Sequence, residues 1–115
     1  MKTFSCLIFT VSFLVAGAGA QAGLQEGVSA YKRGHFPVAL KELTPLAERG
    51  DAKAQAILGE MYSSGSGVPQ NLAKAALWYR KAAEQGHASA QTYLGGMYGR
   101  GAGVRRNDRK AAFWK

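Results

Sequence analysis

The chain has 115 residues, 47% of them hydrophobic, and its 15 basic residues outnumber 7 acidic ones to give a net charge of +8. A chain of this length forms one small domain with a thin core. A single cysteine, Cys6, excludes an intramolecular disulfide, so the fold must rest on packing alone.

The N-terminus has the pattern of a secretory signal peptide. Lys2 precedes an apolar run over residues 3–16, and Ala18-Gly19-Ala20 fits an A-x-A cleavage site. The run is shorter than the ~20 apolar residues that a membrane-spanning helix needs, so it predicts export rather than an anchor. We expect removal of residues 1–20, with cleavage after Ala22 as the alternative. The product is a periplasmic or secreted protein without cysteine or a transmembrane segment.

Residues 21–50 resemble a degenerate tetratricopeptide-type helical hairpin with a tight loop. Gly34, Phe36, Ala39 and Leu40 match the junction between its two helices. Pro37 fits the first turn of the second helix, where its missing N–H costs nothing. Pro45 falls inside the same helix and predicts a kink.

Residues 51–86 predict two helices. The helix spacing i, i+3, i+4, i+7, i+8 marks the first, which we call helix A: Ala54, Ile57, Leu58, Met61 and Tyr62. The same spacing marks the second, helix B: Leu72, Ala75, Ala76, Tyr79, Ala82 and Ala83. Asp51 and Asn71 are the expected N-caps, and Gly86 is the expected left-handed residue at the end. Residues 63–70 between the helices are too rich in Gly and Ser for a strand.

Residues 87–115 repeat this unit. Leu58-Gly59 recurs as Leu94-Gly95, and Trp78 recurs as Trp114, a period of 36 residues. A fixed period of about 20 to 50 residues marks a repeat architecture, in which each unit buries its apolar face on the next. The copy is incomplete at Lys115, so we expect a longer natural chain or a last helix completed by a partner. The loop glycines also recur, which predicts a positive φ for Gly65, Gly67, Gly101 and Gly103.

The repeated motifs resemble the Sel-one-like repeat, a relative of the tetratricopeptide repeat with a longer loop between its helices. Leu-Gly, Met-Tyr, Gly-x-Gly-Val, Ala-x-x-Trp-Tyr and Ala-Ala-x-x-Gly all fall at the family's spacing over residues 51–115. The resemblance implies an all-α fold, an α/α solenoid of stacked antiparallel helix pairs wound into a right-handed superhelix. It also implies a non-enzymatic scaffold that binds a peptide or protein segment on a concave face lined by helix A.

The alternative function is a cell-wall-related hydrolase or β-lactam-binding protein, an activity assigned to cysteine-rich secreted relatives. Those relatives carry a cysteine pair in each repeat, and this chain has none. No nucleophile, base and orienting group form a recognisable set, and His35 and His87 lack other ligands at metal spacing. Gly65-Ser66-Gly67-Val68 lacks the strand and the Gly-Lys of a phosphate-binding loop. We therefore expect no catalytic residue, metal or cofactor.

The resemblance places one set of residues on the concave face, pointing outward from helix A: Lys53, Ala56, Glu60, Ser63, Ser64, Ser89, Thr92, Gly96, Gly99 and Arg100. These positions differ between the two repeats while the core positions match. A specific groove would show that difference, and so would an unconstrained solvated surface. The candidate partner-binding residues are Lys53, Glu60, Ser64, Ser89, Thr92, Arg100, Arg105 and Arg106.

Basic residues gather late in the chain, where Asp108 is the lone acid: Arg100, Arg105, Arg106, Arg109, Lys110 and Lys115. They predict an acidic protein partner or an anionic envelope surface. The other interpretation is a solvated face. Nucleic acid fits the charge as well, but an exported protein rarely meets it.

The recurring aromatic side chains are expected to fill the joints between hairpins rather than to form a ligand cage. Tyr93 departs from this rule, because its counterpart one repeat earlier is Ile57.

Overall fold

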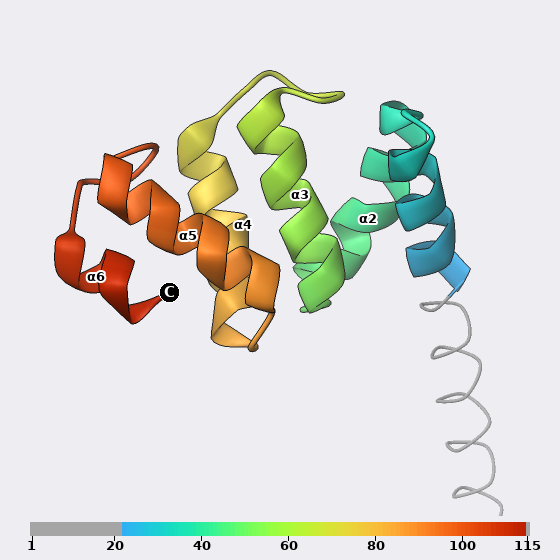
Figure 1. Ribbon diagram of the computed structural model, residues 1–115. Helices are drawn as coiled ribbons and strands as arrows, with labels where there is room; N and C mark the ends of the chain where they lie inside the picture. The colour runs from blue at the N-terminus through green and yellow to red at the C-terminus, as the bar shows by residue number, and fades with distance from the viewer. Residues whose placement is uncertain (1–21, 115) are drawn as a thin grey trace, which may run out of the picture.

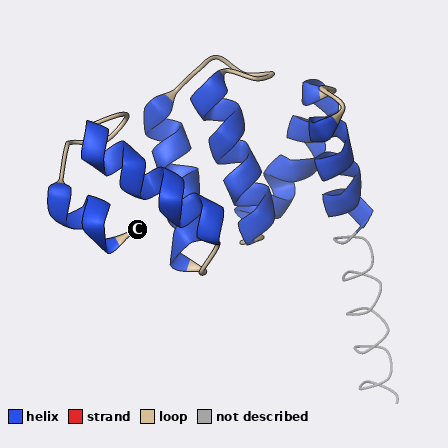
Figure 2. Cartoon of the chain, viewed as in Figure 1, coloured by secondary structure: helices blue, strands red, loops and turns tan. Residues whose placement is uncertain are grey.

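The computed structural model describes residues 22–114 (Figure 1). Residues 22–32 are helical, and five further helices follow: α2 (Phe36–Glu48), α3 (Ala52–Ser64), α4 (Leu72–Glu84), α5 (Ala88–Arg100) and α6 (Asp108–Phe113). No strand occurs in this range (Figure 2), so the predicted all-α class is confirmed. The predicted signal peptide lies outside the described residues.

Each helix packs on its neighbours in sequence, and α3 also packs on α5. Figure 1 shows α3, α4 and α5 side by side, joined by turns at alternate ends. The molecule is therefore the predicted solenoid of stacked antiparallel helix pairs. In each pair helix A comes first, as the helix of residues 22–32, α3 or α5, and helix B follows as α2, α4 or α6.

Side-chain caps start the helices where the sequence predicted them. The Asp51 carboxylate accepts a hydrogen bond from the Ala54 N–H at 2.9 Å, and the Asn71 side chain accepts one from the Lys74 N–H at 3.0 Å. Each cap satisfies one of the N–H groups that a helix start leaves without an internal partner. His87 replaces Asp51 in the next repeat, and its Nδ1 accepts from the Ala90 N–H at 3.3 Å. His87 therefore caps the start of α5.

The loop between helices A and B packs against the preceding hairpin. Gly65 ends α3 with φ of +73°, and Gly67 follows with φ of +76°, so the predicted positive φ values are confirmed. A Cβ on Gly67 would lie 2.5 Å from the Cβ of Phe36, at the start of the preceding helix B. One repeat later, a Cβ on Gly103 would collide with the backbone of Leu72. Glycine is needed here for its backbone conformation and for this close approach.

The first hairpin has the shorter connection, residues 33–35, against residues 65–71 in the second. Pro37 lies in the first turn of α2, as predicted. Pro45 lies inside α2, which continues to Glu48. Proline has no N–H, so α2 lacks one internal hydrogen bond at this point.

The core consists of two clusters along the row of helices. The first includes Leu43, Leu58 and Met61, between the first hairpin and α3, and the second includes Tyr79 and Leu94, between α3, α4 and α5. Trp78 packs against the first cluster and Trp114 against the second, each only partly buried. These tryptophans occupy the joints between hairpins, as the repeat predicted.

One predicted surface position is wrong. Ala56 was placed on the outward face of helix A, yet it is 4% exposed and belongs to the second cluster. The reason is that α3 meets α5 as well as α4. A short side chain on this side of α3 allows the two helices to approach.

Candidate functional site

Three hollows with shared lining residues lie along the side of the molecule formed by the A helices. The first section, a hollow of about 440 Å³, is lined by Leu24, Gln25, Val28, Ser29, Lys32 and Lys53. The middle section, about 240 Å³, is lined by Val28, Tyr31, Lys32, Lys53, Ala56, Ile57, Glu60, His87 and Ser89. The last, about 270 Å³, is lined by Tyr31, Glu60, Ser63, Ser64, Tyr79 and Tyr93. Adjacent sections share lining residues, so we treat them as one helix-A groove.

Four of the candidate binding residues line this groove: Lys53, Glu60, Ser64 and Ser89. Thr92 is exposed on α5 but lines none of the three sections, and its hydroxyl donates to the Ala88 carbonyl at 3.2 Å. Arg100, Arg105 and Arg106 lie outside the groove, at the end of α5 and in the loop that follows. The candidates other than Thr92 therefore fall into a groove set and a basic set.

Glu60 and Tyr31 join two different hairpins across the groove. The Tyr31 hydroxyl donates to Oε2 of Glu60 at 2.8 Å. Burial, with the hydrogen bond to Glu60 adding to it, raises the pKa of Tyr31 to about 12, so this hydroxyl stays protonated at neutral pH. Within residues 22–114, no basic side chain lies within ion-pair distance of the Glu60 carboxylate.

Tyr31, Tyr79 and Tyr93 line the same section of the groove as this carboxylate. Tyr79 is 3% exposed, and burial raises its pKa above the usual value. Tyr93 stacks on Tyr79 with ring centroids 5.2 Å apart and remains 49% exposed. The last section of the groove thus presents one carboxylate between aromatic surfaces.

The opposite end of the groove is basic. Lys32 and Lys53 line its first and middle sections, and both are exposed. Ser89 and the His87 helix cap complete the middle section. A bound segment would therefore meet Lys32 and Lys53 in the first and middle sections, and Glu60 in the middle and last sections.

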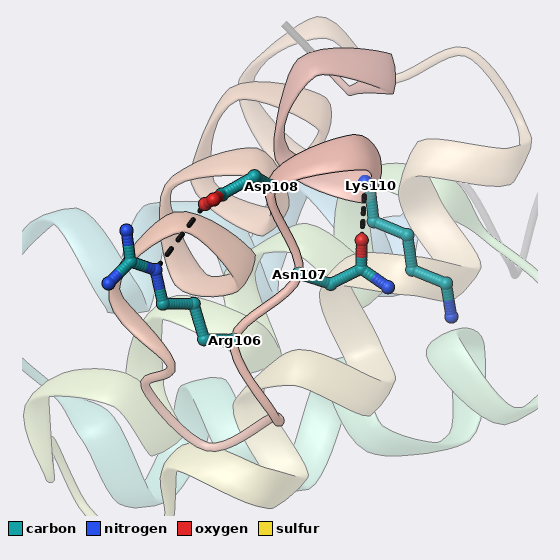
Figure 3. Close-up of polar contacts among 4 residues, drawn as sticks. All are labelled: Arg106, Asn107, Asp108 and Lys110. Carbon is teal, nitrogen blue, oxygen red and sulfur yellow. Dashed lines mark hydrogen bonds and ion pairs between the residues drawn. The ribbon is translucent and has the colours of Figure 1, made fainter.

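The basic set at the end of α5 is strongly exposed. Arg106 Nε lies 3.4 Å from Oδ1 of Asp108, with the two side chains 71% and 76% exposed (Figure 3). An ion pair in this much water contributes little to stability. Next to it, the Asn107 side chain accepts from the Lys110 N–H at 3.0 Å and caps α6 (Figure 3). Arg100 and Arg105 are exposed as well.

Another hollow, of about 350 Å³, lies between α3 and α4 outside the groove. It is lined by Tyr62, Lys74, Leu77, Trp78 and Lys81. Lys81 lies over the Trp78 ring, with Nζ 4.8 Å from the centroid, and Lys74 lies over Tyr62 at 5.4 Å. The two lysines therefore already pair with the aromatic rings of this hollow.

Sequence reasoning missed Tyr31 and Tyr93 as groove residues. Tyr93 follows the groove residue Ser89 by one helical turn, and its difference from Ile57 already set it apart. Tyr31 lies in the degenerate first unit, whose alignment with the later repeats is too weak to place a single side chain.

Among residues 22–114 no three His, Asp or Glu side chains are grouped to hold a metal ion. In the same range no helix is both long enough and apolar enough to cross a membrane.

Comparison with known sequences gives one repeated match. The sequence model of the Sel1 repeat matches residues 52–87 and again residues 88–114. A search of curated proteins gives no match.

Solved structures with the same architecture include a Sel1 repeat protein from Oxalobacter formigenes, 36% identical, with a TM-score of 0.75 over 80% of this chain. A protective antigen of uropathogenic Escherichia coli with an SLR fold is also 36% identical, with a TM-score of 0.77 over 88% of this chain. The chain spans 37% and 23% of those two proteins. Cysteine-rich protein B of Helicobacter pylori is 22% identical and shares the fold, with a TM-score of 0.65 over 84% of this chain and 83% of its own.

Proposed function

Because the chain belongs to the Sel1 repeat family, whose members are generally protein–protein interaction modules, we propose that it is a non-enzymatic scaffold of the bacterial periplasm or secreted fraction. It binds a peptide or protein segment along the helix-A groove. The proposed location rests on the signal-peptide pattern of residues 1–20.

The proposal rests on hollows that share lining residues and that are lined from three successive A helices. The sections of the groove share Val28, Tyr31, Lys53 and Glu60, so an extended segment lying along it would contact every repeat. Repeat proteins bind through extended surfaces of this kind, because stacking leaves one long face open. The residues lining the groove differ between repeats, which gives each section its own chemistry.

The basic set contributes a second contact in this proposal. Arg100, Arg105 and Arg106 recognise an acidic part of the partner or an anionic envelope surface. Their exposure leaves the guanidinium groups accessible to carboxylates or phosphates, which arginine can bind through pairs of hydrogen bonds.

Blocking the groove tests the proposal. The double variant Ser64→Trp, Ser89→Trp places two large rings in the groove at residues that are exposed, so the fold should persist. The matched control is Lys41→Trp, Glu84→Trp, at exposed positions on B helices. In a pull-down from envelope extract, the control variant should recover the partner and the groove variant should not. Equal recovery with both variants would contradict the groove as the binding face.

Charge reversal tests the basic set separately. The triple variant Arg100→Glu, Arg105→Glu, Arg106→Glu should fold normally and lose partner binding, and wild-type binding should weaken as salt rises. If wild type and the triple variant recover the same partners at both low and high salt, the basic set is only a solvated face. Cell fractionation with N-terminal sequencing of the mature protein tests the export, with Ala20 or Ala22 as the last residue removed.

A further inference from the structure

We propose that the last section of the helix-A groove, lined by Tyr31, Glu60 and Tyr93, binds an arginine side chain of the segment that occupies the groove. This inference rests on the proposed function, because it assigns the chemistry of one contact within the same groove. The bound arginine would determine how the rest of the segment is positioned along the groove.

The first argument is the unpaired charge of Glu60. The protein carries a net charge of +8, yet no basic side chain of residues 22–114 pairs with this carboxylate. Lys32 and Lys53 line the middle section together with Glu60, but neither lies within ion-pair distance of its carboxylate. The Tyr31 hydroxyl supplies one hydrogen bond, to Oε2. A carboxylate accepts several hydrogen bonds, so Glu60 keeps acceptor capacity for a ligand.

The second argument is the aromatic surface around the carboxylate. Tyr93 is 49% exposed, and its ring is held in place by stacking on the buried Tyr79. Tyr31 stands on the other hairpin and is fixed by its bond to Glu60. The face of an aromatic ring attracts a cation, and an adjacent carboxylate strengthens that preference.

Arginine fits this combination better than lysine. Its guanidinium is planar, stacks on an aromatic ring and pairs with a carboxylate through two parallel hydrogen bonds. The section has a volume of about 270 Å³, just below the usual range for a small-molecule pocket. That size suits one side chain of a longer segment.

A titration with short peptides tests the site. The probe is Ac-Gly-Ser-Arg-Ser-Gly-NH2, added to isotope-labelled protein purified from cells that express the full chain. We expect saturable chemical-shift changes centred on Tyr31, Glu60 and Tyr93. The peptide with citrulline in place of arginine keeps the shape and loses the charge, and it should bind at least tenfold more weakly. A lysine peptide should fall between the two.

Variants separate the two contributions. Glu60→Gln should weaken binding of the arginine peptide at least tenfold, and Tyr93→Ala about fivefold, while Tyr93→Phe keeps the ring and the affinity. Glu84→Gln, at an exposed glutamate outside the groove, should leave binding unchanged. The backbone spectra of all variants report whether the fold is intact.

Equal binding of the arginine and citrulline peptides, or full affinity in folded Glu60→Gln, would overturn the site. Equal binding of lysine and arginine peptides would overturn the choice of arginine. If the peptide does not bind but the natural partner is still lost on blocking the groove, this inference fails and the proposed function stands. If the groove block has no effect either, the proposed function fails as well.

Discussion

Gln55 on α3 donates a hydrogen bond from Nε2 to the carbonyl oxygen of Ala47, in the last turn of α2, at 3.0 Å. Gln55 is the buried polar residue of the core, 3% exposed, and its Oε1 accepts from Gln85 at 2.9 Å. One repeat later, Gln91 makes the equivalent bond to Ala83 at 3.1 Å. In the second and third hairpins, a glutamine on helix A thus forms a hydrogen bond to the end of the preceding helix B.

Gln55→Ala should therefore destabilise the protein by about 1 kcal/mol, because it removes a hydrogen bond from a buried joint while the Ala47 carbonyl keeps its bond from the Gly50 N–H. Gln91 is only partly buried, so water can replace its side chain, and Gln91→Ala should have a smaller effect. Urea unfolding of both variants gives the comparison. A larger loss for Gln91→Ala would contradict the role assigned to burial.

Gly67 and Gly86 both have positive φ values, +76° and +91°, but their surroundings differ. A side chain at Gly86 meets no atom within 4 Å, whereas one at Gly67 meets Phe36. Gly86→Ala should cost about 1–2 kcal/mol for the backbone conformation alone. Gly67→Ala should cost more, because the loop must also move away from α2. Thermal melts with equal midpoints for the two variants would contradict the close packing of this loop.

Trp78 and Leu77 are adjacent on α4 and have different surroundings. Trp78 packs on the first core cluster, whereas Leu77 is 55% exposed. We expect Trp78→Ala to cost about 3 kcal/mol, at the lower end for a large buried aromatic. Leu77→Ala should change stability by about 0.5 kcal/mol or less. Denaturant unfolding measures both values, and a loss below about 1 kcal/mol for Trp78→Ala would mean that the joint does not depend on this ring.

Alkaline pH should loosen the contact between the first two hairpins. The pKa of Tyr31 is about 12 in the folded protein against an ordinary value of 10.0, so folding favours the protonated hydroxyl. The resulting stabilisation is complete below pH ~10 and is lost as the pH rises toward 12. Melting temperatures measured from pH 9 to 12 should fall less steeply in Tyr31→Phe than in wild type. Identical slopes would show that ionisation of Tyr31 does not contribute to the loss of stability at alkaline pH.

Features that lie within one helical unit were predictable from the sequence. The apolar stripes of α3 and α4 follow from helical periodicity, and the caps Asp51 and Asn71 follow from residue chemistry. The loop glycines were identified because they recur at the repeat period. Each of these features depends on neighbours within a few residues of the chain.

Features that depend on how one hairpin meets another were not predictable. Ala56 has the helical spacing of a surface position, but the contact between α3 and α5 buries it. Tyr31 and Glu60 are 29 residues apart, and only the stacking of the first two hairpins brings them together. The repeat period contains no information on the angle between successive hairpins, which decides where the groove opens.

Site-specific photo-crosslinking in intact cells can show whether the partner lies in the helix-A groove. A benzophenone amino acid is placed singly at Ser64 and Ser89 in the groove, and at Lys41 and Glu84 on B helices. We predict that the same partner is captured from both groove positions and from neither B-helix position. Capture from Lys41 and Glu84, with none from Ser64 and Ser89, would show that the partner binds outside the groove.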